Sequence, residues 1–267
     1  MNKLLNILFI AMMTITRPAI AGSAQDTEIQ FTVAAVEKFA KEVEKFAAKE
    51  GARAFIIGRV GRPEKELPKG IKFTHTAVAI YSSIKLDSGE TVKGYAIHNL
   101  YQKKGQLDKS ELIIDYPVDF FWGVNSLKAG VIIPTPDLQK RILDVIASGK
   151  DKLIHNKNYS VIANPFNNIF QNCTEHTLNI VNSGIYQTTD IQQLKSNTKQ
   201  HFKPQKVKAS PFKLLLGNWF VDDVSTKDHS GSVYTTTFTA IGKYLKNNNL
   251  LSKAVVLKTD GSTEQLL

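Results

Sequence analysis

The chain has only one cysteine, Cys173, among its 267 residues. A single cysteine excludes an internal disulfide, so no covalent cross-link within the chain can stabilise the fold. The thiol is free either to react or to pack as a small apolar side chain. Which of these holds depends on its neighbours in the sequence.

Long apolar segments are also scarce. The longest, Leu4–Ile15, is too short for a bilayer, which takes about 20 apolar residues. Lys3 precedes it and the small-x-small sequence Ala19–Ala21 follows it, a pattern typical of a cleaved signal peptide over residues 1–21. We therefore expect export to the periplasm or the extracellular space, with no transmembrane segment in the mature chain 22–267. No cysteine follows the cleavage site, which excludes a lipid-anchored lipoprotein.

Dense runs of charge are absent too. The chain has 34 basic and 24 acidic residues, and removal of Lys3 and Arg17 with the signal peptide leaves 32 − 24 = +8. The basic residues are scattered and do not alternate with aromatic ones, so no nucleic-acid partner is expected. There is no glycine-rich phosphate loop and no cluster with metal-ligand spacing, so we expect no cofactor and no metal.

The sequence does contain an alternation of helix and strand patterns. Apolar residues at helical spacing predict a helix over 33–50, and Thr135 before Pro136 predicts another that ends at Gly149. Segments rich in Val, Ile, Tyr and Thr predict strands. The strands are expected at 54–60, at 73–84 and 91–102 as a hairpin around Asp87-Ser88-Gly89, and at 112–114, 131–133, 159–163 and 254–258.

This pattern predicts an α+β fold, with a small, mostly antiparallel sheet packed against helices. We expect a single domain over 22–267. Its core should span about 52–187, and an extra helical segment should follow at about 188–267. The aromatic group Phe120, Phe121 and Trp122 is more typical of a core than of a lipid-binding surface.

Cys173 lies where a loop is predicted to become a helix. Asn172 is a good N-cap, and Glu175 three residues later completes a capping-box pattern, which places Cys173 at the first helical position. The helix is expected to end near Ser183, with Gly184 as its terminator. The helix dipole would lower the pKa of a thiol at this position, and nearby N–H groups could stabilise an oxyanion. A nucleophile benefits from all of these features, whereas an inert buried cysteine needs none.

His75 is the histidine best placed to act as the base. It interrupts an apolar strand, on the face shared with Phe73 and Ala77, where small neighbours leave room for another group to approach. The facing strand should orient the ring. A two-residue turn would place Gln102 opposite His75 and a longer loop would place His98 there, while Asn99 falls on the other face in either register. The alternative is a half-buried histidine satisfied by a backbone carbonyl.

The order of these residues resembles the circularly permuted papain-like fold of the NlpC-type superfamily, which includes relatives of lecithin retinol acyltransferase. The segment from Thr74 to Tyr81 is similar to its histidine strand, and Asn172-Cys173 to its Asn-Cys helix start. The acyltransferase branch reads Asn-Cys-Glu-His, whereas this chain has Thr174 inserted. The resemblance therefore implies Cys173 and His75 as a catalytic pair but does not imply a lipid-acyl substrate.

Three further segments are similar to a bacterial exported family known only as a domain of unknown function. They are Gly58–Arg62, Gly94–Ile97 and Gln171–Glu175, and the similarity extends over most of the mature chain. This resemblance implies a fold but brings no activity with it.

Together these features predict an exported thiol hydrolase that acts by acyl transfer on an amide or ester. Cys173 would attack the carbonyl, His75 would carry the proton, and Gln102 or His98 would orient the ring. The N–H of Cys173 and the side chain of Gln171 would stabilise the oxyanion. The NlpC-type resemblance implies a peptidoglycan peptide as the substrate. The alternatives are a non-catalytic envelope-binding protein on the same scaffold and lipid-acyl processing at a membrane surface.

Overall fold

The computed structural model describes residues 30–207 and 224–267. The predicted signal peptide lies outside the described residues. The elements are α1 (Val33–Lys49), β1 (Ala54–Val60), a 3₁₀ turn (Glu64–Glu66), β2 (His75–Lys85), β3 (Thr91–Lys103), β4 (Gln106–Asp115), α2 (Pro117–Phe120), β5 (Ser126–Pro134), α3 (Pro136–Ala147), α4 (Lys150–Leu153), α5 (Cys173–Tyr186), α6 (Ile191–His201), β6 (Gln205–Lys206), β7 (Tyr234–Thr235), α8 (Phe238–Asn247), β8 (Leu251–Leu257) and β9 (Thr263–Gln265).

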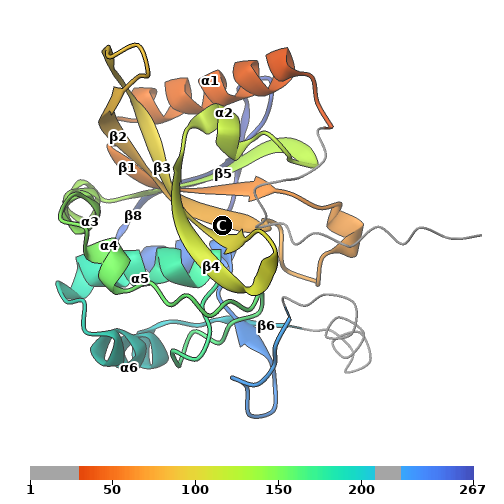
Figure 1. Cartoon of the computed structure of the whole chain (residues 1–267), viewed down its shortest axis with the longest axis vertical. Helices are drawn as coiled ribbons and strands as arrows, with labels where there is room; N and C mark the ends of the chain where they lie inside the picture. The colour runs from red at the N-terminus through yellow and green to blue at the C-terminus, as the bar shows by residue number, and fades with distance from the viewer. Residues whose placement is uncertain (1–29, 208–223) are drawn as a thin grey trace, which may run out of the picture.

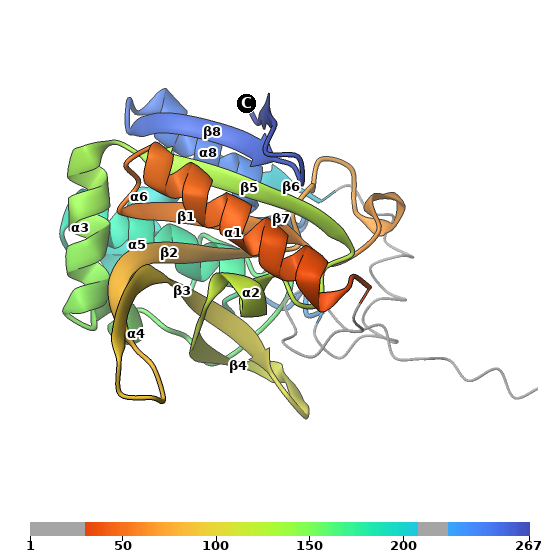
Figure 2. The same cartoon turned by 90° about the horizontal axis from the view of Figure 1, so that it is seen from above.

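The centre of the fold is a seven-stranded antiparallel sheet in the order β4-β3-β2-β1-β5-β8-β9. Helices cover both of its faces. Figures 1 and 2 show α1 and α2 on one side and α3, α5, α6 and α8 on the other. The fold is α+β, as expected, but the sheet is larger than predicted.

The alternation of side chains along the strands produces two hydrophobic cores. All seven residues of β1 are buried, which is what a central strand covered on both faces requires. Phe55 and Ile57 pack with α1 and α2, whereas Ala54 and Ile56 pack with the helices of the other face. Phe120 and Phe121 are fully buried in the first core, so the core interpretation of the aromatic group is confirmed for these two side chains.

Helix α1 forms where the sequence predicts it. The Thr32 side chain accepts a hydrogen bond from the Ala35 N–H at 3.3 Å, which caps the first turn. Val36, Phe39 and Val43 are buried at helical spacing, whereas Val33 is 51% exposed. The helix therefore packs on the sheet through the apolar residues that the sequence predicts, except Val33.

Two local predictions are wrong. The segment 159–163 forms only a single bridge, between Tyr159 and Gln171, because the rest of it turns away from the sheet. Helix α5 does not end at Gly184 but continues to Tyr186, and Gln187 then adopts the left-handed conformation at φ 52°. Gly184 faces α3 instead, where a Cβ atom would lie 3.4 Å from Leu138.

The segment that follows residue 188 contains helices, as the sequence suggests, and it also joins the central sheet through a strand that overlaps the one predicted at 254–258. It supplies β8, which pairs with β5 from Ala129↔Leu257 to Pro134↔Leu251, and α8, which packs beneath these strands. Within the described part of the chain, no helix combines the length and the apolar character needed to cross a membrane.

Candidate active site

Helix α5 begins at Cys173, as the sequence predicts. The Asn172 side-chain oxygen accepts a hydrogen bond from the Glu175 N–H at 2.9 Å, and its Nδ2 donates to the Val161 carbonyl at 2.9 Å. The predicted return contact from Glu175 does not form, because that carboxylate is buried in an ion pair with Lys195. One polar residue thus caps the helix and also anchors the loop that leads to the thiol.

The thiol lies against the beginning of β2. The backbone of Thr76 is close enough to the sulfur to lower the pKa of the thiol, and the Thr174 hydroxyl lies 3.7 Å from the sulfur. The Thr177 hydroxyl, one turn further along α5, reaches the Thr76 carbonyl at 3.4 Å. Thr76 directly follows His75 in β2, so the thiol lies against the residue next to His75 in the chain.

The His75 ring is held firmly from two directions. It is fully buried and stacks on Tyr101, with ring centroids 4.7 Å apart and an angle of 5° between the planes. Its Nε2 is 2.9 Å from the Oδ1 atom of Asn99. Asn99 therefore fixes the orientation of the ring.

The hydrogen bonds of Asn99 determine the tautomer of His75. Its Nδ2 donates to the Ile97 carbonyl at 2.9 Å and to the Asp115 carboxylate at 3.3 Å, so its Oδ1 must accept from His75. Nε2 of His75 consequently carries the proton. Nδ1 keeps its lone pair, and no described atom donates a hydrogen bond to it. This nitrogen therefore has a lone pair free to accept a hydrogen bond.

A second layer of polar groups supports Asn99. The Tyr101 hydroxyl donates to the same Asp115 oxygen at 2.5 Å. The Arg59 guanidinium donates to the Phe120 carbonyl at 2.6 Å and lies 5.5 Å from the centre of the Tyr101 ring. These contacts leave the Asn99 side chain little freedom to rotate.

Burial keeps both members of the pair neutral. It raises the pKa of the Cys173 thiol, which is only 4% exposed, against the opposing hydrogen bonds of Thr76 and Thr174. Burial also lowers the pKa of His75 well below its usual range, and the nearby charge of Arg59 adds to this effect. The expectation of a lowered thiol pKa is therefore wrong, because desolvation outweighs the helix dipole.

The predicted third residues do not face His75. The hairpin pairs Lys85 with Thr91 and Val78 with His98, and this register places Tyr101 and Asn99 on the face of His75. A shift of one residue from the assumed register moves every side chain to the opposite face.

Gln102 and His98 consequently lie on the other side of the sheet. The Gln102 amide donates to the Leu107 carbonyl at 2.7 Å. His98 faces α5, and burial together with Lys152 lowers its pKa to about 4. The sequence pattern predicts Asn99 on the opposite face. The only signal for Asn99 in the sequence is a side-chain amide on the strand that faces His75.

The predicted role of Gln171 also changes. Gln171 is fully buried, and its amide bonds the Asn156 N–H and the Ile154 carbonyl, so it shapes a loop rather than an oxyanion hole. His176, three residues after the thiol on α5, is 3% exposed. Burial lowers its pKa to about 3, with contributions from His155 and His98.

The C-terminal segment holds the loop that precedes Cys173. The Asp228 carboxylate accepts from the Asn164 N–H at 2.7 Å, and the Thr235 hydroxyl donates to the Ala163 carbonyl at 3.1 Å. Sequence reasoning assigned no role to this region. Its described part braces the approach to α5.

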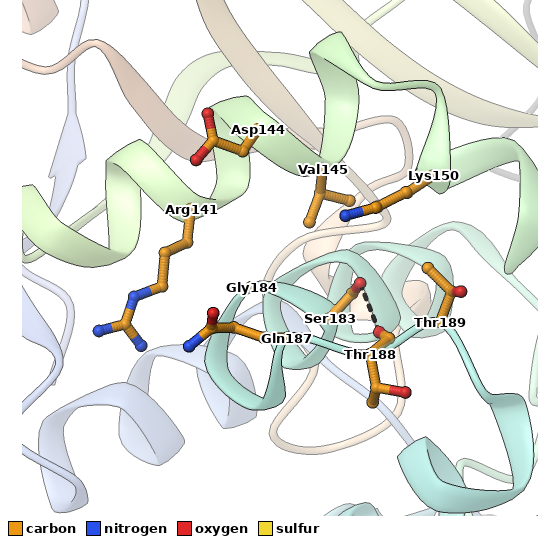
Figure 3. Close-up of a pocket in the computed structure, with 9 residues that line it drawn as sticks. All are labelled: Arg141, Asp144, Val145, Lys150, Ser183, Gly184, Gln187, Thr188 and Thr189. Atoms are coloured by element: carbon orange, nitrogen blue, oxygen red, sulfur yellow. Dashed lines mark hydrogen bonds between the residues drawn. The ribbon is translucent and has the colours of Figure 1, made fainter.

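Neither Cys173 nor His75 lines any of four surface cavities that described residues form. Figure 3 shows the one of about 430 Å³ between α3 and the end of α5, where the Ser183 hydroxyl donates to the Thr188 carbonyl at 2.7 Å. Because α5 has 14 residues, this cavity lies about 20 Å from the thiol. It belongs to a different part of the surface.

Comparison with known proteins gives a family and no activity. No curated protein and no solved structure matches the chain. The family described as "Uncharacterized protein conserved in bacteria (DUF2145)" matches residues 46–245, which include β1 to β5 and all of α5. The chain therefore belongs to this family of conserved bacterial proteins.

Proposed function

We propose that this protein is an exported thiol hydrolase that acts by acyl transfer, with Cys173 as nucleophile, His75 as base and Asn99 as the residue that positions the base. The observation that carries the proposal is the tautomer of His75. Asn99 holds the proton on Nε2 and leaves Nδ1 without a hydrogen-bond partner among the described atoms, while the next residue of the chain, Thr76, lies against the start of α5. A structural histidine gains nothing from a buried nitrogen without a partner.

The chemistry begins from the neutral pair. Nδ1 of His75 takes the thiol proton as the sulfur of Cys173 attacks the carbonyl carbon, and the carbonyl π electrons move to the oxygen. The backbone N–H of Cys173 is the nearest candidate to stabilise this oxyanion. The carbon–nitrogen or carbon–oxygen bond then breaks, and His75 returns the proton to the leaving amine or alcohol.

Hydrolysis of the thioester completes the cycle. His75 takes a proton from water as the water oxygen attacks the thioester carbonyl, and the carbon–sulfur bond breaks with return of that proton to the sulfur. Because both groups are buried, the substrate has to gain access through a rearrangement around the thiol. The resemblance to the NlpC-type superfamily and the signal-like N-terminus support a peptidoglycan stem peptide as the amide substrate.

The test uses the purified mature protein and muropeptide fragments. We expect slow release of a stem-peptide product and a mass increase on Cys173 from the trapped acyl group. Cys173→Ala and His75→Ala should both abolish turnover, whereas His201→Ala, an exposed histidine on α6, should retain it. Full turnover in either of the first two variants would remove that residue from the mechanism.

A second candidate is a non-catalytic envelope-binding protein, and the raised pKa of the buried thiol favours it. Alkylation by iodoacetamide across pH separates the two. An enzyme should become more reactive at Cys173 when a substrate fragment is added, because binding has to open the site. A binding protein should show a thiol that reacts slowly below pH 9 with or without the fragment and rapidly only in urea.

A further inference from the structure

Lysines that are far apart in the sequence meet in one cavity. The cavity has a volume of about 540 Å³ and lies between the edge strand β4 and the segment that follows α4. Its charged lining consists of Lys103, Lys109, Lys152, Lys157, the titratable His155 and a single acid, Glu111. The basic residues that look scattered along the chain are therefore concentrated here by tertiary structure.

Among the described residues, three of these four lysines have no ion-pair partner: no carboxylate forms an ion pair with Lys103, Lys152 or Lys157. Lys109 is partly engaged, since it donates to the Asn158 side chain at 2.9 Å and lies 3.3 Å from Asp108. Lys103, Lys152 and Lys157 are exposed, so water and salt screen their mutual repulsion, and an anion in the cavity would be attracted by all of these ammonium groups.

The two walls of the cavity are joined by hydrogen bonds. The Ser110 N–H donates to the Lys157 carbonyl at 2.8 Å, and the Ser110 hydroxyl lies 3.0 Å from Nε2 of His155. Lys109 and Asn158 form a β-bridge beside them. The lysines from the two walls therefore extend from a backbone that is already in place, which reduces the entropy lost on binding.

We propose that this cavity binds a ligand bearing phosphate groups. Lysine ammonium groups bind phosphate as point charges from several directions, and four of them suit a ligand with more than one phosphate. The volume lies within the range of small-molecule sites. Two exposed apolar side chains follow lining residues in the sequence: Ile114, 57% exposed, comes two residues after Leu112, and Leu153, 71% exposed, comes directly after Lys152. An anionic lipid headgroup and a soluble oligophosphate share the required chemistry.

The test measures binding by the purified mature protein in two arms. One arm titrates inorganic pyrophosphate by calorimetry at low salt, and the other sediments the protein with vesicles of phosphatidylglycerol or of phosphatidylcholine. Binding to pyrophosphate alone identifies a soluble ligand, and binding to phosphatidylglycerol but not phosphatidylcholine identifies a headgroup. Either result supports the proposal, and the absence of both overturns it.

Matched variants locate the site. Lys152→Gln with Lys157→Gln should weaken binding by about tenfold or more, because two charge-assisted contacts are lost. Lys85→Gln with Lys199→Gln removes the same net charge from exposed positions that do not line the cavity, and it should change binding less than about twofold. Equal losses in the two double variants would mean non-specific attraction and overturn the proposal. Cys173→Ala should bind as the wild type does, which keeps this result separate from the hydrolase proposal.

Discussion

At the scale of single residues, the site depends on which amide reaches His75. Asn99 bonds the ring, while its sequence neighbour His98 points to the opposite face of the same strand. The alternation of a β-strand makes these two adjacent residues a natural pair for comparison. A substitution of Asn99 should disturb the His75 ring directly, whereas a substitution of His98 should leave that ring in place.

We expect Asn99→Ala to reduce turnover at least about 100-fold, because His75 then loses the acceptor that holds its proton on Nε2. The substrate concentration at half-maximal rate should change little. His98→Gln is the control and should retain turnover to within about threefold. Steady-state kinetics on the same muropeptide measure both variants, and a greater loss in His98→Gln would refute the assignment of Asn99.

At the scale of elements, two glycines let α8 approach the sheet. Gly58 and Gly130 are paired across β1 and β5, and the Phe238 ring of α8 lies over both. A Cβ atom at Gly130 would lie 2.5 Å from this ring and 2.8 Å from Phe73. These positions are therefore glycine because a helix packs there, and not because of backbone conformation.

We expect Gly130→Ala to lower the free energy of unfolding by roughly 1–3 kcal/mol through overpacking. Phe238→Leu should also destabilise, since it leaves a cavity. In the double variant, the smaller side chain gives the new methyl group room, so the combined loss should be less than the sum. Urea unfolding of the four proteins measures this coupling, and strictly additive losses would show that the ring and the glycine do not oppose each other.

At the scale of the whole molecule, buried titrating groups make stability depend on pH. Burial lowers the pKa of His75, His98, His155 and His176, to about 4 for His98 and about 3 for His176. The unfolded chain, with histidine pKa values near 6.5, then binds more protons below that pH, so stability is lost as the pH falls. Burial raises the pKa of Glu175 to about 7, although the charge of Lys195 works to lower it. The folded chain then holds a proton on Glu175 that the unfolded chain releases, so this group adds stability as the pH falls.

Burial also raises the pKa values of Asp115 and Asp151, which act in the same direction as Glu175. The four histidines outnumber these three carboxyl groups, so the histidine effect should be the larger one between pH 6.5 and about 4.5. The temperature of unfolding should therefore be several degrees lower at pH 5 than at pH 7.5. His98→Gln should flatten this dependence, because it removes about one of the protons taken up on unfolding. Scanning calorimetry at the two pH values checks the prediction, and an unfolding temperature that is equal or higher at pH 5 contradicts it.

Local pattern alone was enough to locate α1, β1 and the start of α5. Asn172 caps the helix at Cys173 whatever surrounds it, and apolar spacing defines the buried face of α1, since both depend on residues within one or two turns. Cys173 and His75 each lie at the beginning of an element, α5 and β2, and the start of α5 contacts Thr76 at the start of β2.

Contacts between distant segments determined the features that the sequence did not predict. The five residues from 86 to 90, between Lys85 and Thr91, set a strand register in which Asn99, and neither Gln102 nor His98, reaches His75. Burial by distant segments reversed the expected shift in the thiol pKa and kept the histidines neutral. The fold also concentrated lysines in a cavity that no run of sequence reveals. Register, desolvation and charge density arise between elements, and so a linear pattern cannot determine them.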